Sequence, residues 1–140
     1  MLVGTNDEID KQLPANIISI HKTDNQKELA ELYSVADLFV NPTREEVLGM
    51  VNIESLACGT SVLTFKTGGS PEIPDEKTGY VVDVDDIDEM EKQIKRICTT
   101  KLFSTDDCLK RPKAFDAIKK YQEYIDLYRQ SLIKDKRCNV

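Results

Sequence analysis

The chain has 140 residues, 40% of them hydrophobic and 31% charged, so it is long and apolar enough for one ordinary domain with a buried core. Its 25 acidic side chains outnumber the 19 basic ones, and the formal net charge of -6 argues against the basic surface that nucleic-acid binding requires. No apolar run approaches the roughly 20 residues of a membrane span.

The four cysteines show no Cys-x-x-Cys pairing; they are Cys58, Cys98, Cys108 and Cys138. With a single histidine, His21, the chain offers few ligands for zinc. We therefore expect free thiols, no bound metal and a cytoplasmic location.

Short apolar or β-branched runs recur along the first part of the chain, and each predicts a strand. The runs cover residues 2–3, 16–22, 37–43, 61–65 and 80–84.

Helical spacing of apolar residues separates most of these runs. Two capping boxes mark helix starts, one formed by Asn25 and Glu28 and the other by Asp86 and Glu89. Ser70, which precedes a proline, is expected to be the N-cap of a short helix. The longer helices are expected over about 26–36, 49–58 and 87–97.

This alternation of mostly apolar strands with helices predicts an α/β fold. The strands should form a parallel sheet covered on both faces, in a doubly wound, Rossmann-like arrangement. Ligands of such sheets bind outside the carboxyl ends of the strands. After Cys98 the pattern becomes polar and broken, and residues 114–132 then predict a helix with an aromatic face. That face could pack on the edge of the sheet or on a surface that this chain does not contain.

Two acids flank the helix expected at 49–58. Glu46 lies in the loop before it and Glu54 in its second turn, leaning back toward its start. The free amides of a helix start attract anions, whereas carboxylates accept hydrogen bonds from sugar hydroxyls. A ligand with a diphosphate between two sugars would use both. The bland alternative is that Glu46 only complements the helix dipole and Glu54 is a solvated helix residue, which is the commoner role of such a pair.

The wider pattern lowers the weight of that alternative. It resembles the donor-binding half of GT-B glycosyltransferases of the retaining, family 4 type (glycosyl transferases group 1), and especially bacterial enzymes that build capsular, exopolysaccharide or O-antigen sugars. The stretches that carry the resemblance are ELAELYSVADLFVNPT (28–43), the acid-x7-acid spacing, ESLACGTSVLTF (54–65), TGGSPE (67–72) and KTGYVVD (77–83).

The resemblance implies roles at matching positions. Glu54 would hold the ribose hydroxyls of the nucleotide, and Glu46 would contact the donor sugar as the catalytic residue. The backbone at Gly49, Met50 and Val51 would meet the sugar and the diphosphate.

The loop of His21, Lys22 and Thr23 matches the place where the nucleotide base docks. For His21, a strand-end residue without a ligand is an equally weighted alternative. For Gly68 and Gly69, a plain turn is favoured over contact with the ligand.

The sequence departs from the family pattern in two respects. The family commonly has Gly-Phe after the first acid, whereas this chain has Val47-Leu48, so the donor sugar stays open. The first strand of the domain, with the basic residues that clamp the diphosphate, would lie before Met1, and the acceptor domain is absent. The expected organisation is a nucleotide-sugar-binding domain over 1–100 and a helical segment over 101–140 that packs on it or on the missing N-terminal domain.

The resemblance implies a glycosyltransferase that moves a sugar from a nucleotide-diphosphate sugar to a glycan or lipid-linked acceptor, with retention and without a metal or other cofactor. The missing domain could bring the protein to the inner face of the membrane. Two alternatives are a non-catalytic nucleotide-sugar-binding module that needs a separate acceptor-domain chain, and a flavodoxin-like signalling domain. The latter lacks an acidic cluster to accompany Asp83.

Overall fold

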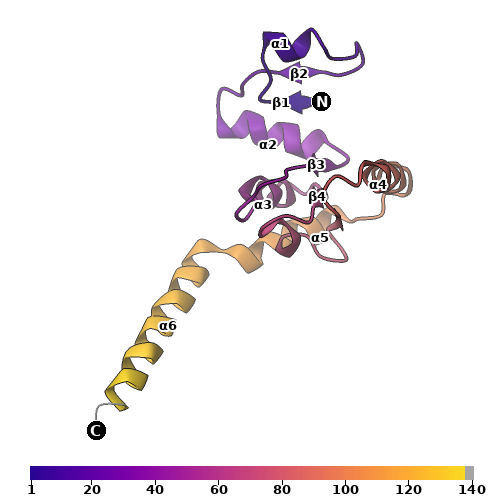
Figure 1. Cartoon of the computed structure of the whole chain (residues 1–140). Coiled ribbons are helices and arrows are strands. Elements are labelled where there is room, and N and C mark those ends of the chain that lie inside the picture. Colours follow the sequence, from indigo (N-terminus) through magenta and orange to yellow (C-terminus); the bar gives the residue numbers. More distant parts are fainter. Residues whose placement is uncertain (138–140) are drawn as a thin grey trace.

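The structure is a computed structural model that describes residues 1–137, with side chains described as far as Leu132. Cys138 lies outside the described residues. The elements follow one another as expected, with strands and helices alternating over the first hundred residues (Figure 1). No helix among the described residues combines the length and the apolar character needed to cross a bilayer.

A three-stranded parallel sheet forms the centre of the molecule. Its strands are β3 (Phe39–Asn41), β4 (Val62–Phe65) and β5 (Gly79–Val82), in that order. Every residue of the middle strand β4 is buried. Because side chains alternate between the two faces of a strand, β4 contributes to two separate hydrophobic clusters.

Helices cover both faces of this sheet. The first cluster joins β4 to α3 (Met50–Ala57) and α5 (Thr105–Lys110), and its buried members are Leu56, Val62, Ile73 and Cys108. The second joins β4 and β5 to α4 (Ile87–Thr100), through Leu63, Phe65, Val82 and Met90. The prediction of a doubly wound parallel α/β fold is confirmed.

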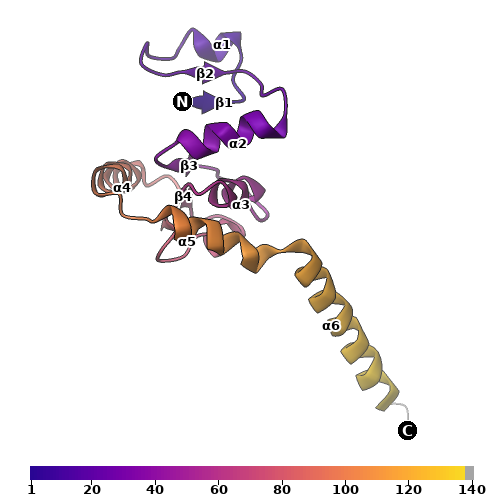
Figure 2. The same ribbon diagram turned by 180° about the vertical axis from the view of Figure 1, so that it is seen from behind.

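The prediction of one continuous sheet was wrong in this structure. Strands β1 (Leu2–Val3) and β2 (Ser19–Ile20) pair with each other in parallel but form a separate two-stranded sheet. Helix α2 (Gln26–Val35) follows this pair and leads to β3 (Figures 1 and 2). The run expected as a strand over 16–22 narrows to two residues, because the amide of Ile17 turns back to the carbonyl of Pro14.

The predicted helix starts are confirmed, but the capping boxes form only in part. The side chain of Asn25 accepts a hydrogen bond from the amide of Glu28, and that of Asp86 accepts one from Glu89. In a complete capping box, the glutamate side chain also accepts a hydrogen bond from the amide of the N-cap residue, and neither glutamate does so here. Glu28 accepts from the amide of Asp24, and Glu89 instead binds side chains further along α4.

Ser70 is the first residue of a short 3-10 helix, η1 (Ser70–Glu72), and Gly69 occupies the N-cap position that we expected for Ser70. The hydroxyl of Ser70 does not cap η1, because it accepts a hydrogen bond from the buried side chain of Asn52. The sequence pattern located the turn but misassigned the partner of this hydroxyl.

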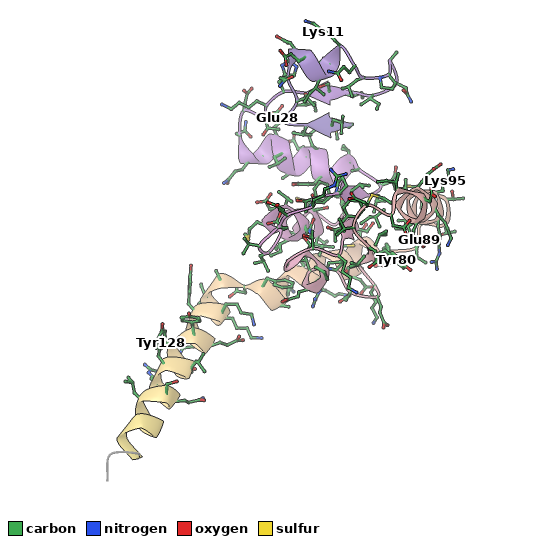
Figure 3. All side chains as sticks on the ribbon, in the orientation of Figure 1. Lys11, Glu28, Tyr80, Glu89, Lys95 and Tyr128 are labelled. Atoms are coloured by element: carbon green, nitrogen blue, oxygen red, sulfur yellow. The ribbon has the colours of Figure 1, made fainter. Side chains whose placement is uncertain are left out.

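The C-terminal segment contains more helix than expected. The stretch considered broken forms α5 and η2 (Arg111–Phe115), which pack on α3. Helix α6 (Ala117–Arg137) then extends away from the body of the molecule in both views (Figures 1 and 2). Its predicted apolar face is exposed, and Figure 3 shows Tyr128 on the projecting part.

The exposed members of that face are Ile118, Tyr121, Ile125, Tyr128 and Leu132. Among the described cysteines, Cys58, Cys98 and Cys108 are all free thiols, as expected.

Candidate functional site

The loops that follow the three strands of the central sheet meet at its carboxyl edge. The hydroxyl of Thr67 donates to the carbonyl of Arg44 over 3.0 Å, and the Arg44 guanidinium binds the carboxylate of Asp85 over 2.7 Å. These contacts join the loops after β3, β4 and β5. The edge where ligands of this fold class bind is therefore a cross-linked set of loops.

Two glycines bring the backbones of two of these loops into direct contact. A Cβ atom on Gly68 would lie 1.6 Å from the carbonyl oxygen of Glu46, and one on Gly69 would lie 2.6 Å from that of Val47. The amide of Gly69 also donates to the Val47 carbonyl over 2.9 Å. The glycines thus permit a close approach between backbones, a role that the sequence alone did not indicate.

The start of α3 differs from the starts of α1 (Asp7–Asp10), α2, α4 and α5. Those four helices have a side chain that accepts hydrogen bonds from their first amides, supplied by Asn6, Asn25, Asp86 and Ser104. Helix α3 begins after Gly49, which is buried, has a positive φ of 83°, and offers no capping side chain.

The first amides of an α-helix have no acceptor within the helix, so those of Met50 and Val51 are available to a ligand. The side chains of these two residues are 59% and 37% exposed, so solvent reaches this end of the helix. Together with the helix dipole, this gives α3 the properties of an anion-binding helix start.

Along the chain, Glu46 precedes that helix start and Glu54 follows it. Glu46 is half-buried, and its carboxylate accepts a hydrogen bond of 3.0 Å from the amide of Val47. Glu54 is exposed on the second turn of α3. The helix bounds confirm that Glu46 precedes α3 and that Glu54 is on its second turn, whereas the lean of Glu54 toward the helix start and the contact of both acids with one ligand stay predictions.

The negative charge of Glu54 acts on two neighbouring groups. Burial raises the pKa of Tyr33, on α2, to about 12, and the negative charge of Glu54 adds to the effect. Burial also raises the pKa of the Cys58 thiol, and Glu54 again contributes. Tyr33 is in the last turn of α2 and Cys58 is the C-cap of α3, so these contacts lie away from the start of α3 and do not show the carboxylate leaning toward it.

His21, Lys22 and Thr23 follow β2 and so belong to the separate two-stranded sheet. Nε2 of His21 lies 2.7 Å from the Asp10 carboxylate and 3.9 Å from that of Asp7. The hydrogen bond to Asp10 raises the pKa of His21, while hydrogen bonds from Ser19 and then His21 lower the pKa of Asp10.

Asp7, Asp10 and His21 place three potential metal ligands within 4.8 Å of one another, a group that the sequence did not reveal. Its members come from α1 and from the end of β2. It is exposed or half-buried and belongs to a different part of the chain from the start of α3.

A buried polar side chain that sequence reasoning missed lies directly behind the α3 start. Asn52 is fully buried and accepts a hydrogen bond of 3.0 Å from the side chain of Asn41, at the end of β3. Its own amide group donates to the Ser70 hydroxyl over 3.5 Å. An asparagine between the apolar residues Val51 and Ile53 was the available signal.

The parallel fold and the glycine-initiated, uncapped helix at its carboxyl edge define the class of protein: a Rossmann-like domain. Comparison with known sequences then gives the family. Residues 5–116 match the model of the family described as Glycosyl transferases group 1, and the chain belongs to this family of glycosyltransferases.

Named relatives agree with this assignment. Over 58 residues the chain is 43% identical to the alpha-maltose-1-phosphate synthase of Mycolicibacterium smegmatis, a match that covers 41% of this chain and 15% of that protein. Over 70 residues it is 41% identical to the GDP-mannose-dependent alpha-(1-6)-phosphatidylinositol monomannoside mannosyltransferase of the same organism, covering 44% and 18% respectively.

Among solved structures, the fold is similar to that of the sucrose-phosphate synthase of Thermosynechococcus elongatus. The TM-score is 0.73 at 27% identity, over 90% of this chain and 33% of that one. The chain thus spans about a third of the length of this structural relative. The family match favours the glycosyltransferase interpretation over a signalling domain.

Proposed function

We propose that this chain is the donor-binding part of a retaining glycosyltransferase, which transfers a sugar from a nucleotide-diphosphate sugar to a glycan or lipid-linked acceptor in the synthesis of a cell-surface polysaccharide. The observation that carries the proposal is the start of α3, where amides without a side-chain cap follow Glu46 and precede Glu54 along the chain. The same arrangement would serve any nucleotide-diphosphate sugar, which leaves the sugar and the base open.

In the proposed complex, the amides of Met50 and Val51 receive the diphosphate. Glu54 accepts hydrogen bonds from the ribose hydroxyls, and Glu46 contacts the donor sugar, because an ionised carboxylate can accept from two hydroxyls at once. The loop of 21–23 meets the base.

The proposed chemistry breaks the bond between the anomeric carbon and the diphosphate oxygen and forms one to the acceptor oxygen on the same face of the sugar. Negative charge grows on the departing phosphate, and the fixed amides of the α3 start stabilise it as it forms. The proton of the acceptor hydroxyl passes to the departing phosphate oxygen in the same process. Each of these steps uses amides and side chains, with no role assigned to a metal.

The exposed face of α6 supports a further part of the proposal, namely that the acceptor-binding domain packs there. Its apolar side chains are largely solvent-exposed, as Ile118 at 80% and Tyr121 at 71% illustrate. Burying such residues at a domain interface is favourable by roughly 25 cal/mol for each Å² of apolar surface. In a peripheral membrane enzyme of this design, the acceptor domain would make the contact with the inner face of the membrane.

The test is the affinity of the chain for a panel of nucleotide-diphosphate sugars that includes UDP-glucose and GDP-mannose, measured by calorimetry. Replacing Glu54→Ala should lower the affinity about tenfold or more, because it removes the acceptor for the ribose hydroxyls. Glu91→Ala is the matched control, an exposed helix glutamate on α4 that is paired with Lys95. Unchanged affinity in the Glu54 variant, or no binding to any member of the panel, would overturn the proposal.

A second candidate is a non-catalytic module that acts only with a separate chain carrying the acceptor domain. The exposed apolar face of α6 favours a partner of this kind as well. Size-exclusion chromatography with and without a co-expressed acceptor domain of a relative separates the two. A stable complex of two chains with transferase activity supports the module, and activity that requires one continuous polypeptide excludes it.

A further inference from the structure

A buried polar link connects three segments around the α3 start. The Asn41 side chain, at the end of β3, donates to Asn52 on α3, and Asn52 donates to Ser70 at the start of η1. Asn52 and Ser70 are both fully buried. Neither side chain can reach a ligand in solution, so any effect of this link on binding must act through the backbone that it supports.

The link lies in contact with Gly49. A Cβ atom on Gly49 would be 2.8 Å from Nδ2 of Asn52 and 3.1 Å from the hydroxyl oxygen of Ser70. These two polar groups therefore occupy the space that a side chain at position 49 would need. Gly49 is also the residue from which α3 begins. The Asn52 amide therefore lies against the residue that immediately precedes the first free amides of the helix.

The same link holds the loop that covers the α3 start. Residues 67–70 are joined to the loop of 44–48 by backbone contacts, including the bond from the Gly69 amide to the Val47 carbonyl. On the opposite side, their only side-chain connection to α3 among the described residues runs through Ser70 and Asn52. Loss of the Asn52 side chain would remove the hydrogen-bond partner of the half-buried Asn41 and of the buried Ser70. Leaving buried polar groups without a partner lowers the stability of the fold.

We infer that Asn52 is a positioning residue of the donor site: its buried side chain aligns the amides at the start of α3 with the loop of 67–70, so that both are preorganised for the diphosphate. The inference rests on the proposed function, because a diphosphate must bind at α3 for the alignment to matter. Asn52 acts through Gly49 and Ser70 and touches no substrate.

The test compares Asn52→Leu with Gln93→Leu. Each change removes a buried side-chain amide from a helix, but Gln93 is on α4, where it binds Glu89 instead of supporting α3. We expect Asn52→Leu to lower the affinity for UDP-glucose or GDP-mannose about tenfold or more, and Gln93→Leu to leave it within twofold. A similar loss of affinity in both variants, or no loss in a folded Asn52→Leu protein, would overturn the inference.

Amide NMR spectra of the ligand-free chain separate a failure of this inference from a failure of the proposed function. Asn52→Leu should shift the signals of Gly49, Met50, Val51 and Gly69, and Gln93→Leu should not. If those shifts occur but the parent chain binds no nucleotide sugar, the alignment stands and the proposed function fails. If Asn52→Leu does not fold, Ser70→Ala removes the hydroxyl alone, and unchanged amide signals in that variant would refute the link.

Discussion

The two regions that carry the predicted donor-site residues differ in how closely their segments pack and in how much of them is exposed to solvent. Around α3, the loops of 44–49 and 67–70 are joined by backbone contacts so close that a single Cβ atom does not fit, and a buried amide supports them from behind. In the β1–β2 region, which carries His21, two short strands pair, the side-chain hydrogen bonds and ion pairs around His21 are exposed or half-buried, and both residues of β1 are more than 40% exposed.

In the proposed donor site, this difference would divide the binding of the ligand between a rigid region and an adaptable one. Preorganised amides bind a charged group best when they do not move, and the packed backbone around α3 provides that rigidity. The loop after β2 depends on contacts that water and salt weaken. We therefore expect the diphosphate end of the site to be rigid and the base end to be adaptable.

The largest effect should come from breaking the backbone contact with Gly68→Ala. The new Cβ atom would collide with the Glu46 carbonyl at 1.6 Å, and the positive φ of 49° is itself unfavourable for alanine. We expect the free energy of unfolding to fall by about 3–5 kcal/mol, the range of strongly destabilising substitutions. Urea denaturation followed by circular dichroism measures this loss.

Gly4→Ala is the matched control in the other region. Gly4 has a φ of 86°, but nothing lies within 4 Å of the Cβ position, so only the backbone strain of about 1–2 kcal/mol is expected. Equal losses in the two variants would show that the contact between the loops contributes nothing, and the contrast between the two regions would fail.

A smaller effect is expected for Gly49→Ala. The positive φ of 83° costs about 1–2 kcal/mol, and the added Cβ atom must also displace the side chain of Asn52. The loss of stability should be about 2–3 kcal/mol, with a loss of affinity for nucleotide-diphosphate sugars.

Gly59→Ala is the control that separates the loss of stability expected for Gly49→Ala from its loss of affinity. Gly59 follows the other end of α3, has a φ of 86°, and its Cβ position lies 2.7 Å from the side chain of Thr105. It should lose similar stability and keep its affinity, as measured by calorimetry on protein verified to be folded. Weakened binding in the Gly59 variant would mean that general destabilisation explains both results.

The contrast between the regions also explains how far the sequence could predict the structure. The β4 strand, the start of α4 at Asp86 and the start of α3 follow from local patterns, and the structure confirms them. Two short strands do not specify which sheet they join, because strand pairing depends on partners distant in the sequence. The single sheet was therefore predicted where two exist.

Local sequence patterns also could not predict which side chains form hydrogen bonds with residues distant in the sequence. The partner of Ser70 is Asn52, 18 residues earlier, and the partner of His21 is Asp10, 11 residues earlier. No periodicity links such pairs, whereas the spacing of Glu46 and Glu54 around one helix start is visible in the sequence. The buried link through Asn52 and the group of potential metal ligands both depend on hydrogen bonds between residues distant in the sequence, so local patterns could not predict either of them.

The smallest expected effect is a pH dependence confined to the β1–β2 region. Folding raises the pKa of His21 above 6.5, so the stability from its pair with Asp10 is fully present below pH 6.5 and is lost as the pH rises through the raised pKa. Folding lowers the pKa of Asp10 below 3.8, so its contribution is present above pH 3.8 and is lost as the pH falls through the lowered pKa.

The pair should therefore stabilise its region most between about pH 4 and pH 6.5, with a small amplitude because both groups face solvent. Between pH 6 and pH 8, amide exchange near Ser19 should accelerate beyond its ordinary pH dependence, whereas exchange in α3 should follow that dependence alone. His21→Asn should abolish the extra acceleration, and 1 M salt should reduce it because exposed pairs are screened. If the extra acceleration survives in the His21 variant, or appears equally in α3, the two regions respond to pH as one unit and the proposed adaptability of the base end is wrong.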